Sequence, residues 1–347
     1  MKVIWFGAGF GDKKNAKGTI FELRKCFLKD LKDSNVFQIE VLNSKITNFE
    51  KLEIFLNEKI DKLIVIGVGP KSLPIFKELS KYNLPKNTFY IHPSHKFVEM
   101  DLYKNVKLDL VFTQEYEIQN NPGLTNFLKK QNTKVCGVLG VAHDLNLESL
   151  KEFGNLIQGW LQENTDIKNS EKGICLAIVG GKTSNGDISK KEVDELLKKA
   201  AEEKYENLVI ILVPRGSQEN YKYIKNQKLN ELQKQYPSKN IVFMPFNTFE
   251  KNLKTSMNYS FNNKKFDAYI GGLGLILNSS GKILTHTDST TLMSELLVLG
   301  LNNVEFVFSQ NTEKCNKNFA EKIPKTSYIN TALKQAEEIY KLVVLHP

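Results

Sequence analysis

Short, continuous apolar runs that alternate with amphipathic stretches constrain the fold of this chain most strongly. The first half contains VIWFG, FQIEVL, KLIVIGVG, TFYIH, LDLVFT and KVCGVLGV, and the second half contains ICLAIVGG, LVIILVP, IVFMPF, KILTHT and VEFVFS. Strands that helices cover on both faces are hydrophobic along their whole length, whereas half-exposed strands alternate apolar and polar residues. The runs therefore predict parallel sheets flanked by helices, which is an α/β fold class.

A polar stretch, NTDIKNSEKG at 164–173, separates the two sets of runs. A chain of 347 residues exceeds one ordinary single-core domain and suggests about two. We therefore expect two Rossmann-like domains, at 1–165 and 172–325, whose parallel sheets face a cleft. The remaining segment, 326–347, is expected to form a helix that packs back across the boundary between the two domains. Its apolar stripe comprises Ile329, Leu333, Ala336, Ile339 and Val343 or Val344.

The net charge of +9 does not indicate a nucleic-acid partner. Lysines are interleaved with glutamates on predicted helix faces, as in ISKKEVDELLKKAAEEKYE, and the only arginines are Arg24 and Arg215. This pattern is typical of a solvated surface, although it leaves open a weak peripheral contact with anionic membrane surfaces.

Cysteine spacing and hydropathy exclude other classes. The cysteines have no CxxC pair and no neighbouring histidine cluster, so neither a metal site nor a disulfide is expected; they are Cys26, Cys136, Cys175 and Cys315. No run approaches the ~18 apolar residues of a membrane span, and MKVIWFGAG lacks the apolar core of a signal peptide. We expect a cytoplasmic protein, with contact at the inner membrane left open.

The first loop, in VIWFGAGFGDKKNAKGTIFEL, resembles a dinucleotide fingerprint only in part. Gly7 and Gly9 fit the first and third glycine positions, but the sixth position is Asp12. A carboxylate there would repel the pyrophosphate that the motif holds at a helix N-terminus. The glycines are better explained as a tight bend.

The stretch ILTHTDSTTLMSELLVLG predicts a strand, a polar turn and a helix capped by Asp288 or Ser289. Backbone amides at 289–291 and the hydroxyls of Thr290 and Thr291 would face an anion beyond the strand. Glu295 lies one turn further on the same helix face and could accept the hydroxyls of a ribose. The alternative is a capped helix with one exposed glutamate.

A second anion site is expected where the strand ICLAIVGG ends. Gly180 and Gly181 would let backbone approach a ligand, and the next helix begins later, at a capping box over 189–192. A phosphate would meet the loop amides and Lys182, and Arg215 follows the neighbouring strand as a bidentate partner. The alternative is that the glycine pair serves only the turn.

Histidines follow two strands of the first half. His143 lies in GVAHDLN, and His92 and His95 lie in IHPSHKF. A histidine at a strand end can act as an acid or base, but one without partners of the right spacing is usually a hydrogen-bonded loop residue. No Ser-His-Asp or Cys-His arrangement can be assembled from these spacings.

Taken together, several segments resemble the mitochondrial-fission ELM (elongated mitochondria) proteins and their bacterial homologues, whose fold is similar to that of GT-B glycosyltransferases. The segments are GDKKNAKG, PSHKF, LDLVFTQEYE, GVAH, IVGGKTSNGDIS, PRGS, DAYIGGL and TDSTTLMSE. Four of them depart from the family pattern. In GDKKNAKG, Asn15 replaces a glutamine. Tyr116 replaces a histidine, PRGS has one arginine instead of two, and DAYIGGL keeps only Tyr269 and Gly271 of its motif.

The resemblance implies a metal-independent glycosyltransferase that needs no cofactor and uses a nucleoside-diphosphate sugar as donor. The domain at 172–325 would bind the nucleotide sugar, with Glu295 on the ribose and Arg215 on the diphosphate. The domain at 1–165 would hold an unknown acceptor, such as a lipid-linked or cell-envelope glycan, with Asp12 or His143 as catalytic base. The alternatives are a catalytically inactive nucleotide-binding or scaffold protein and a nucleoside-diphosphate-sugar epimerase.

Overall fold

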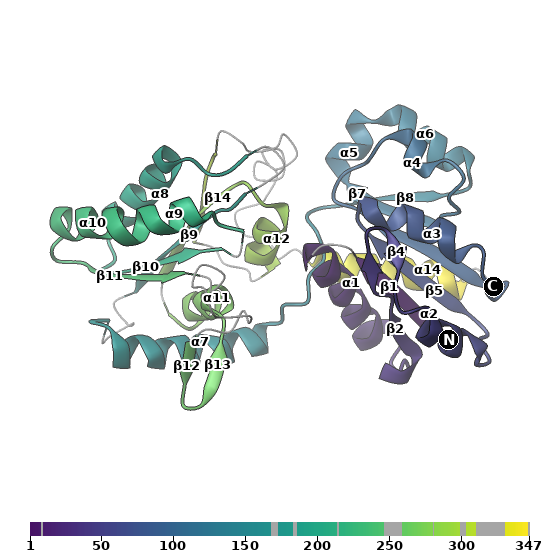
Figure 1. The fold of residues 1–347 in the computed structure, drawn as a ribbon, viewed down its shortest axis with the longest axis horizontal. Helices are drawn as coiled ribbons and strands as arrows, with labels where there is room; N and C mark the ends of the chain where they lie inside the picture. Colours follow the sequence, from purple (N-terminus) through teal and green to yellow (C-terminus); the bar gives the residue numbers. More distant parts are fainter. Residues whose placement is uncertain are drawn as a thin grey trace. The chain divides into compact units, whose positions relative to one another are not determined.

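The structure, a computed structural model, divides the chain into two compact units (Figure 1). Unit 1 comprises Met1–Asp144 and Ile329–Pro347, and unit 2 comprises Leu145–Tyr328. The described residues are 1–7, 10–167, 173–182, 186–213, 215–245, 259–279, 281–298, 303–309 and 330–345.

Unit 1 is built on a six-stranded parallel sheet. Its order is β2 (Val36–Gln38), β1 (Lys2–Gly7), β5 (Leu63–Val68), β6 (Thr88–Pro93), β7 (Leu110–Gln114) and β8 (Lys134–Val138). All residues of β1 and β5 are buried, as their continuous apolar runs predict. The run FQIEVL is divided, because its end forms β3 (Val41–Leu42), which pairs antiparallel with β4 (Lys45–Ile46).

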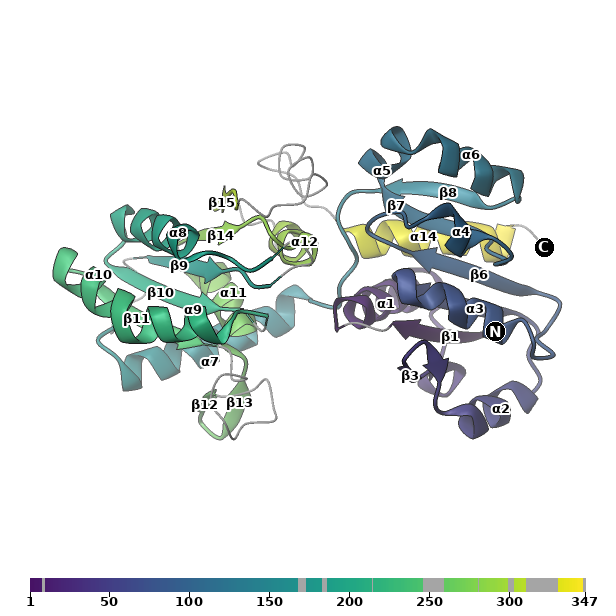
Figure 2. The same cartoon turned by 45° about the horizontal axis from the view of Figure 1, so that its top comes forward.

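Helices cover both faces of this sheet (Figure 2). One face is packed by α1 (Phe10–Glu22), its π-helical continuation (Leu23–Phe27) and α14 (Thr331–Leu345). The other is packed by α2 (Phe49–Asn57), α3 (Leu73–Leu79), α4 (Met100–Tyr103) and α6 (Pro122–Lys130). The remaining elements are α5 (Glu115–Asn120) and short 3-10 turns at Asp33–Asn35 and Pro70–Ser72.

The last helix is part of the core of unit 1. Ala336, Ile339 and Val343 of α14 are fully buried against the same apolar cluster as β1 and α1. Of the predicted stripe, Leu333 is half-buried and Val344 is 36% exposed, while Ile329 lies outside the described residues. The apolar stripe thus faces the sheet of unit 1.

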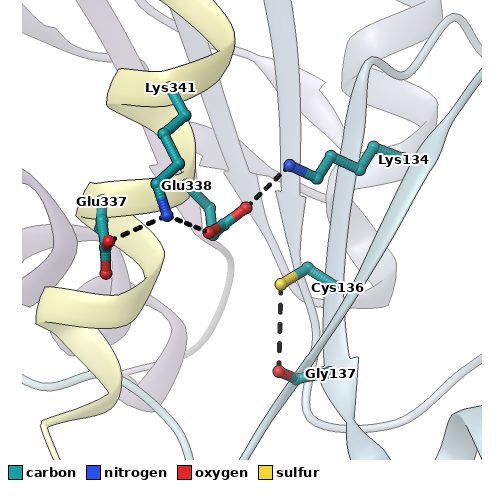
Figure 3. Close-up of polar contacts among 6 residues, drawn as sticks. All are labelled: Lys134, Cys136, Gly137, Glu337, Glu338 and Lys341. Carbon is teal, nitrogen blue, oxygen red and sulfur yellow. Dashed lines mark hydrogen bonds and ion pairs between the residues drawn. The ribbon is translucent and has the colours of Figure 1, made fainter.

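One ion pair joins α14 to the edge strand β8, and two more lie within α14 beside it (Figure 3). Lys134 Nζ of β8 lies 2.7 Å from Glu338 Oε2, and Lys341 Nζ lies 3.0 Å from the other oxygen of Glu338. Lys341 also pairs with Glu337 at 2.8 Å. These lysines keep the pKa of the Glu338 carboxyl below its usual value.

Unit 2 contains a five-stranded parallel sheet. Its order is β11 (Asn240–Pro245), β10 (Asn207–Leu212), β9 (Ile174–Val179), β14 (Gly281–His286) and β15 (Val304–Val307). Beside it lies an antiparallel pair, β12 (Tyr259–Phe261) and β13 (Lys264–Phe266), which the apolar runs do not predict.

In unit 2, α7 (Leu147–Asn164) and α11 (Ala268–Asn278) lie on one face of the sheet. The other face carries α8 (Lys190–Glu202), α9 (Gln218–Tyr223), the π-helix Ile224–Lys228 and α10 (Leu229–Gln235) (Figure 2). The helix α12 (Thr290–Val298) follows β14. The capping box predicted at 189–192 is confirmed at the start of α8.

The helix α7 belongs to unit 2, whereas the predicted boundary assigned it to the first domain. Its buried side contacts α11 so closely that a Cβ on Gly154 would lie 2.4 Å from the backbone of Gly274. Leu150, Ile157 and Leu161 of α7 are buried in the same cluster as the sheet of unit 2. This packing explains the boundary at Asp144, well before the polar stretch.

Both sheets reverse their strand order beside their first strand. In unit 2, the chain passes from β9 through β10 to β11 and then continues with β14 on the other side of β9. In unit 1, β2 and β5 flank β1 in the same way. The predicted α/β class with parallel sheets is confirmed. Ligands of such sheets bind beyond the carboxyl ends of the strands at this reversal.

Candidate functional site

The loops after β9 and β14 meet at the carboxyl edge of the sheet in unit 2. The Gly180 amide donates to His286 Nδ1 at 3.1 Å, and the Gly181 amide donates to Asp288 Oδ2 at 3.0 Å. The Lys182 amide donates to the carbonyl of Arg215 at 2.8 Å. The predicted segments do meet, but the loop amides that were expected to face a phosphate already donate to other groups. All three have partners within the protein.

The glycine pair is required by close packing. A Cβ on Gly180 would lie 2.3 Å from Asp288 Oδ1, and a Cβ on Gly181 would lie 2.5 Å from the backbone of Arg215. Both distances are far inside van der Waals contact. The two glycines therefore let the loops after β9, β10 and β14 approach one another.

His286 and Asp288 are buried beneath these loops. Since Nδ1 of His286 accepts from an amide, its Nε2 carries the proton and donates to the carbonyl of Glu192 at 3.2 Å. Burial lowers the pKa of His286 and raises the pKa of Asp288. Asp288 Oδ1 has no hydrogen-bond partner among the described residues.

The helix α12 begins at this edge with a capping serine, as predicted. Ser289 Oγ accepts from the amide of Leu292 at 3.3 Å and from Arg215 Nη2 at 3.2 Å. Arg215 and Lys182 are exposed, while Thr290 and Thr291 are partly exposed. An exposed guanidinium beside a helix N-terminus is an arrangement that binds anions.

Glu295 does not face solvent. It is 2% exposed and accepts a hydrogen bond of 2.5 Å from the Tyr269 hydroxyl. Burial and the neighbouring carboxylate raise the pKa of Tyr269 well above its usual value, so the phenol remains a donor. A ribose hydroxyl would have to displace this bond, which weighs against the predicted contact between Glu295 and ribose.

In unit 1, Asp12 lies at the reversal of the sheet. A Cβ on Gly69, which follows β5 at φ 79°, would lie 2.8 Å from Asp12 Oδ1, and a Cβ on Gly7 would lie 2.8 Å from Asp12 Cβ. The tight bend expected at Gly7 therefore brings the first turn of α1 against β1. Gly9 lies outside the described residues. Asp12 is partly exposed at this edge.

The histidines of unit 1 are mostly buried. His143 is 6% exposed, and its backbone packs against Gly18 of α1. His92 is fully buried; its Nδ1 lies 2.8 Å from the carbonyl of Gly67 and 3.1 Å from Ser72 Oγ. Burial lowers the pKa of His92 to about 4. Such a residue is structural rather than an acid or base for a substrate.

Within the described ranges, no group of three or more His, Cys, Asp or Glu side chains is placed to hold a metal ion. Cys26, Cys136 and Cys175 are free thiols, and Cys315 lies outside those ranges. None of the helices in the described part of the chain has the length and hydropathy needed to span a membrane.

No family model and no curated protein sequence matches this chain, so the ELM resemblance stays a prediction. Solved structures match over nearly all of both chains at low identity. A glycosyltransferase from Rickettsia africae ESF-5 has a TM-score of 0.49 at 13% identity, covering 100% of this chain and 99% of that chain. The S. aureus MnaA–UDP structure has a TM-score of 0.45 at 11% identity, covering 99% and 96%. An E. coli protein titled "Trehalose-6-phosphate", bound with UDP-2-fluoro glucose, has a TM-score of 0.42 at 10% identity, covering 100% and 96%.

Proposed function

We propose that unit 2 binds the diphosphate of a nucleoside-diphosphate sugar and that the protein transfers the sugar to an acceptor. The observation that carries this proposal is the position of Arg215. Its exposed guanidinium bonds the capping residue Ser289, so it lies at the N-terminus of α12 and at the reversal of the sheet. These features favour an anionic ligand at one place.

The diphosphate would contact the start of α12 rather than the glycine loop. The amides at 180–182 already have partners, so their loop serves to bring Arg215 and α12 together. The first amides of α12, the hydroxyls of Thr290 and Thr291, and the exposed Lys182 supply further donors.

In the proposed reaction, an acceptor hydroxyl oxygen attacks the anomeric carbon of the sugar and the bond from that carbon to the diphosphate oxygen breaks. The diphosphate leaves with the bonding electron pair, and Arg215 and the start of α12 stabilise its added negative charge. The hydroxyl proton passes to a carboxylate, for which we propose Asp12. Asp12 is partly exposed, whereas His143, the other predicted base, is buried.

A second candidate, nucleotide binding without turnover, is favoured by the burial of Glu295 and by its bond to Tyr269. Both functions require the same diphosphate contacts. They differ in whether nucleotide sugar is consumed, so turnover separates them once binding is established.

The two arginines of the chain allow a matched binding test. Arg215→Ala should weaken binding of UDP, GDP or ADP by about 10- to 100-fold, because a hydrogen bond from a charged group contributes about 1.5–3 kcal/mol. Arg24→Ala, in unit 1, should leave affinity unchanged. Isothermal titration calorimetry measures both. Absence of binding to every nucleoside diphosphate, or equal affinity in Arg215→Ala, would contradict the proposal.

Turnover is then measured with the nucleotide sugar whose diphosphate binds. Release of free nucleoside diphosphate in the presence of a cell-lipid extract would support transfer, and Asp12→Asn should reduce it without changing diphosphate affinity. Binding without release supports the second candidate. Conversion of the nucleotide sugar into an isomer would instead show an epimerase.

A further inference from the structure

A groove with a volume of about 490 Å³ lies in unit 1, beside α1, its π-helical continuation and the edge of the sheet. The volume is within the usual range for small-molecule sites. The groove is lined by Trp5, Lys17, Ile20, Phe21, Arg24, Lys25 and Val36. The proposed nucleotide site uses none of these residues.

The floor of the groove is apolar, and one aromatic ring stands at its mouth. Trp5 of β1 and Ile20 of α1 are 5% and 6% exposed, so they form the base. Phe21 is 47% exposed, although it is a large apolar side chain on a helix whose other apolar residues are mostly buried. An apolar floor and an exposed ring favour a hydrocarbon ligand over a polar one.

Cations surround this apolar surface. Lys17, Phe21 and Lys25 are exposed and follow one another at intervals of four residues, with Lys25 Nζ 5.8 Å from the Phe21 ring centroid. Neither lysine forms an ion pair with another residue of the described part of the chain. Arg24 pairs with Asp33, whose side chain is 93% exposed. Because an exposed ion pair contributes little free energy, Arg24 can leave Asp33 for a ligand anion at little cost. None of the described residues that line the groove carries a carboxylate.

We infer that this groove binds an anionic phospholipid at a membrane surface. The acyl chain would occupy the apolar floor over Trp5 and Ile20, Phe21 would enter the boundary between headgroups and chains, and Lys17, Lys25 and Arg24 would face the phosphates. Charge complementarity selects this occupant, because an apolar floor with a cationic rim matches an amphiphile with an anionic head. The inference does not depend on nucleotide binding.

Vesicle co-sedimentation of the full chain tests this inference. The wild type should bind phosphatidylglycerol/phosphatidylcholine vesicles and not pure phosphatidylcholine. Lys17→Gln/Phe21→Ser/Lys25→Gln should lower the partition coefficient by about 30-fold or more, since each basic residue near an anionic surface contributes about fivefold. All three side chains are exposed, so the variant should keep its fold.

A matched control removes two lysines and one exposed apolar side chain elsewhere in unit 1. Lys51→Gln/Ile54→Ser/Lys59→Gln changes two exposed lysines and one apolar residue that is 67% exposed, in or next to α2. This control should bind vesicles like the wild type. Equal loss in both variants would show attraction to net charge alone and overturn the assignment to the groove, as would equal wild-type binding to neutral vesicles.

Trp5 provides a direct probe of acyl-chain entry. The chain has two tryptophans, so Trp160→Phe leaves Trp5 as the single tryptophan, which can be excited selectively over the tyrosines. Vesicles of phosphatidylglycerol with brominated acyl chains should quench Trp5 emission, whereas unbrominated vesicles should not. Vesicle binding without quenching would overturn the inference, because it would show that lipid contacts the surface but does not enter the groove.

Discussion

Each unit buries a histidine near the carboxyl end of a sheet strand, His92 in β6 and His286 in β14, and the two are held in opposite ways. His92 of unit 1 donates from Nδ1 to the carbonyl of Gly67, and its Nε2 has no hydrogen-bond partner among the described residues. His286 of unit 2 accepts at Nδ1 from the amide of Gly180 and donates from Nε2 to Glu192. The backbone therefore selects a different neutral tautomer in each unit.

The difference separates an edge with a structural role from the edge that carries the proposed diphosphate site. His286 and the neighbouring Asp288 bond the amides of Gly180 and Gly181, so they fix the loop that positions Arg215. His92 bonds a carbonyl inside β5 and lies among aromatic rings. The two sheets have similar topology. In unit 2, side chains hold the loop amides at the carboxyl edge, whereas in unit 1 the buried histidine bonds only to a strand carbonyl and a serine.

The largest expected effect tests whether the units can be separated. Gly18→Ala should destabilise unit 1 by about 3 kcal/mol or more, because the added Cβ would lie 2.0 Å from the carbonyl of His143 and backbone cannot easily move. Urea unfolding followed by Trp5 in a Trp160→Phe background measures unit 1. Unit 2, followed by Trp160 in a Trp5→Phe background, should be unchanged.

Gly123→Ala is the matched control for that change. Gly123 lies in α6 of the same unit, and an added Cβ would meet nothing within 4 Å. This variant should be neutral or more stable by up to about 1 kcal/mol, since alanine favours helix over glycine. Equal stability of the two variants would contradict the close contact between Gly18 and His143.

Acid sensitivity should distinguish the two histidines. The pKa of His92 falls from 6.5 to about 4 on folding, so the unfolded chain binds the extra proton between these values and stability falls as pH falls through that window. From pH 7 to pH 4.5 the loss attributable to His92 should be about 2 kcal/mol. His92→Asn retains a donor for Gly67 and should remove this part of the pH dependence of urea unfolding.

In unit 2 the corresponding effect should be smaller. The pKa of His286 is lowered, which costs stability in acid, whereas the pKa of Asp288 is raised, which costs stability as pH rises. Between pH 6.5 and 3.8 the two contributions oppose each other. If His92→Asn kept the wild-type pH profile, or if unit 2 were the more acid-sensitive unit, the contrast between the edges would be wrong.

The smallest expected effect concerns the amide partners in unit 2. Asp288→Ala should be less stable than Asp288→Asn by about 1 kcal/mol, because the asparagine carbonyl still accepts from the Gly181 amide and alanine leaves that amide unpaired. Unfolding followed by Trp160 measures the difference. Equal stability of both variants would show that the Gly181 bond does not hold the loop.

Much of the fold could be predicted from the sequence, because it follows from local pattern. Each apolar run contains a parallel strand, and the polar residues after β9 and β14 were correctly placed at one edge. The assignment of α7 to unit 2 could not be predicted, since it depends on Gly154 meeting Gly274, which are far apart in the sequence. The pattern also gave no sign of the pair β12–β13.

The site was predicted less completely, for a related reason. Spacing shows that Gly180 and Ser289 both follow strands, but not which way a side chain turns at the end of β14. The side chains of His286 and Asp288 point inward and accept hydrogen bonds from the amides of Gly180 and Gly181. Glu295 points toward Tyr269 and accepts from its hydroxyl. The only available signal was the placement of His286 at the end of a mostly buried strand and of Asp288 two residues later, where a polar side chain needs a partner.

The position of α14 has a consequence for how the chain folds during synthesis. Ala336, Ile339 and Val343 complete a core that also contains Val3 and Trp5, so this core cannot be completed until the residues that follow unit 2 have been translated. Unit 2 is fully encoded before them and can fold while the ribosome still holds the end of unit 1. Unit 2 can therefore complete its core before unit 1 does, although unit 1 begins earlier in the chain.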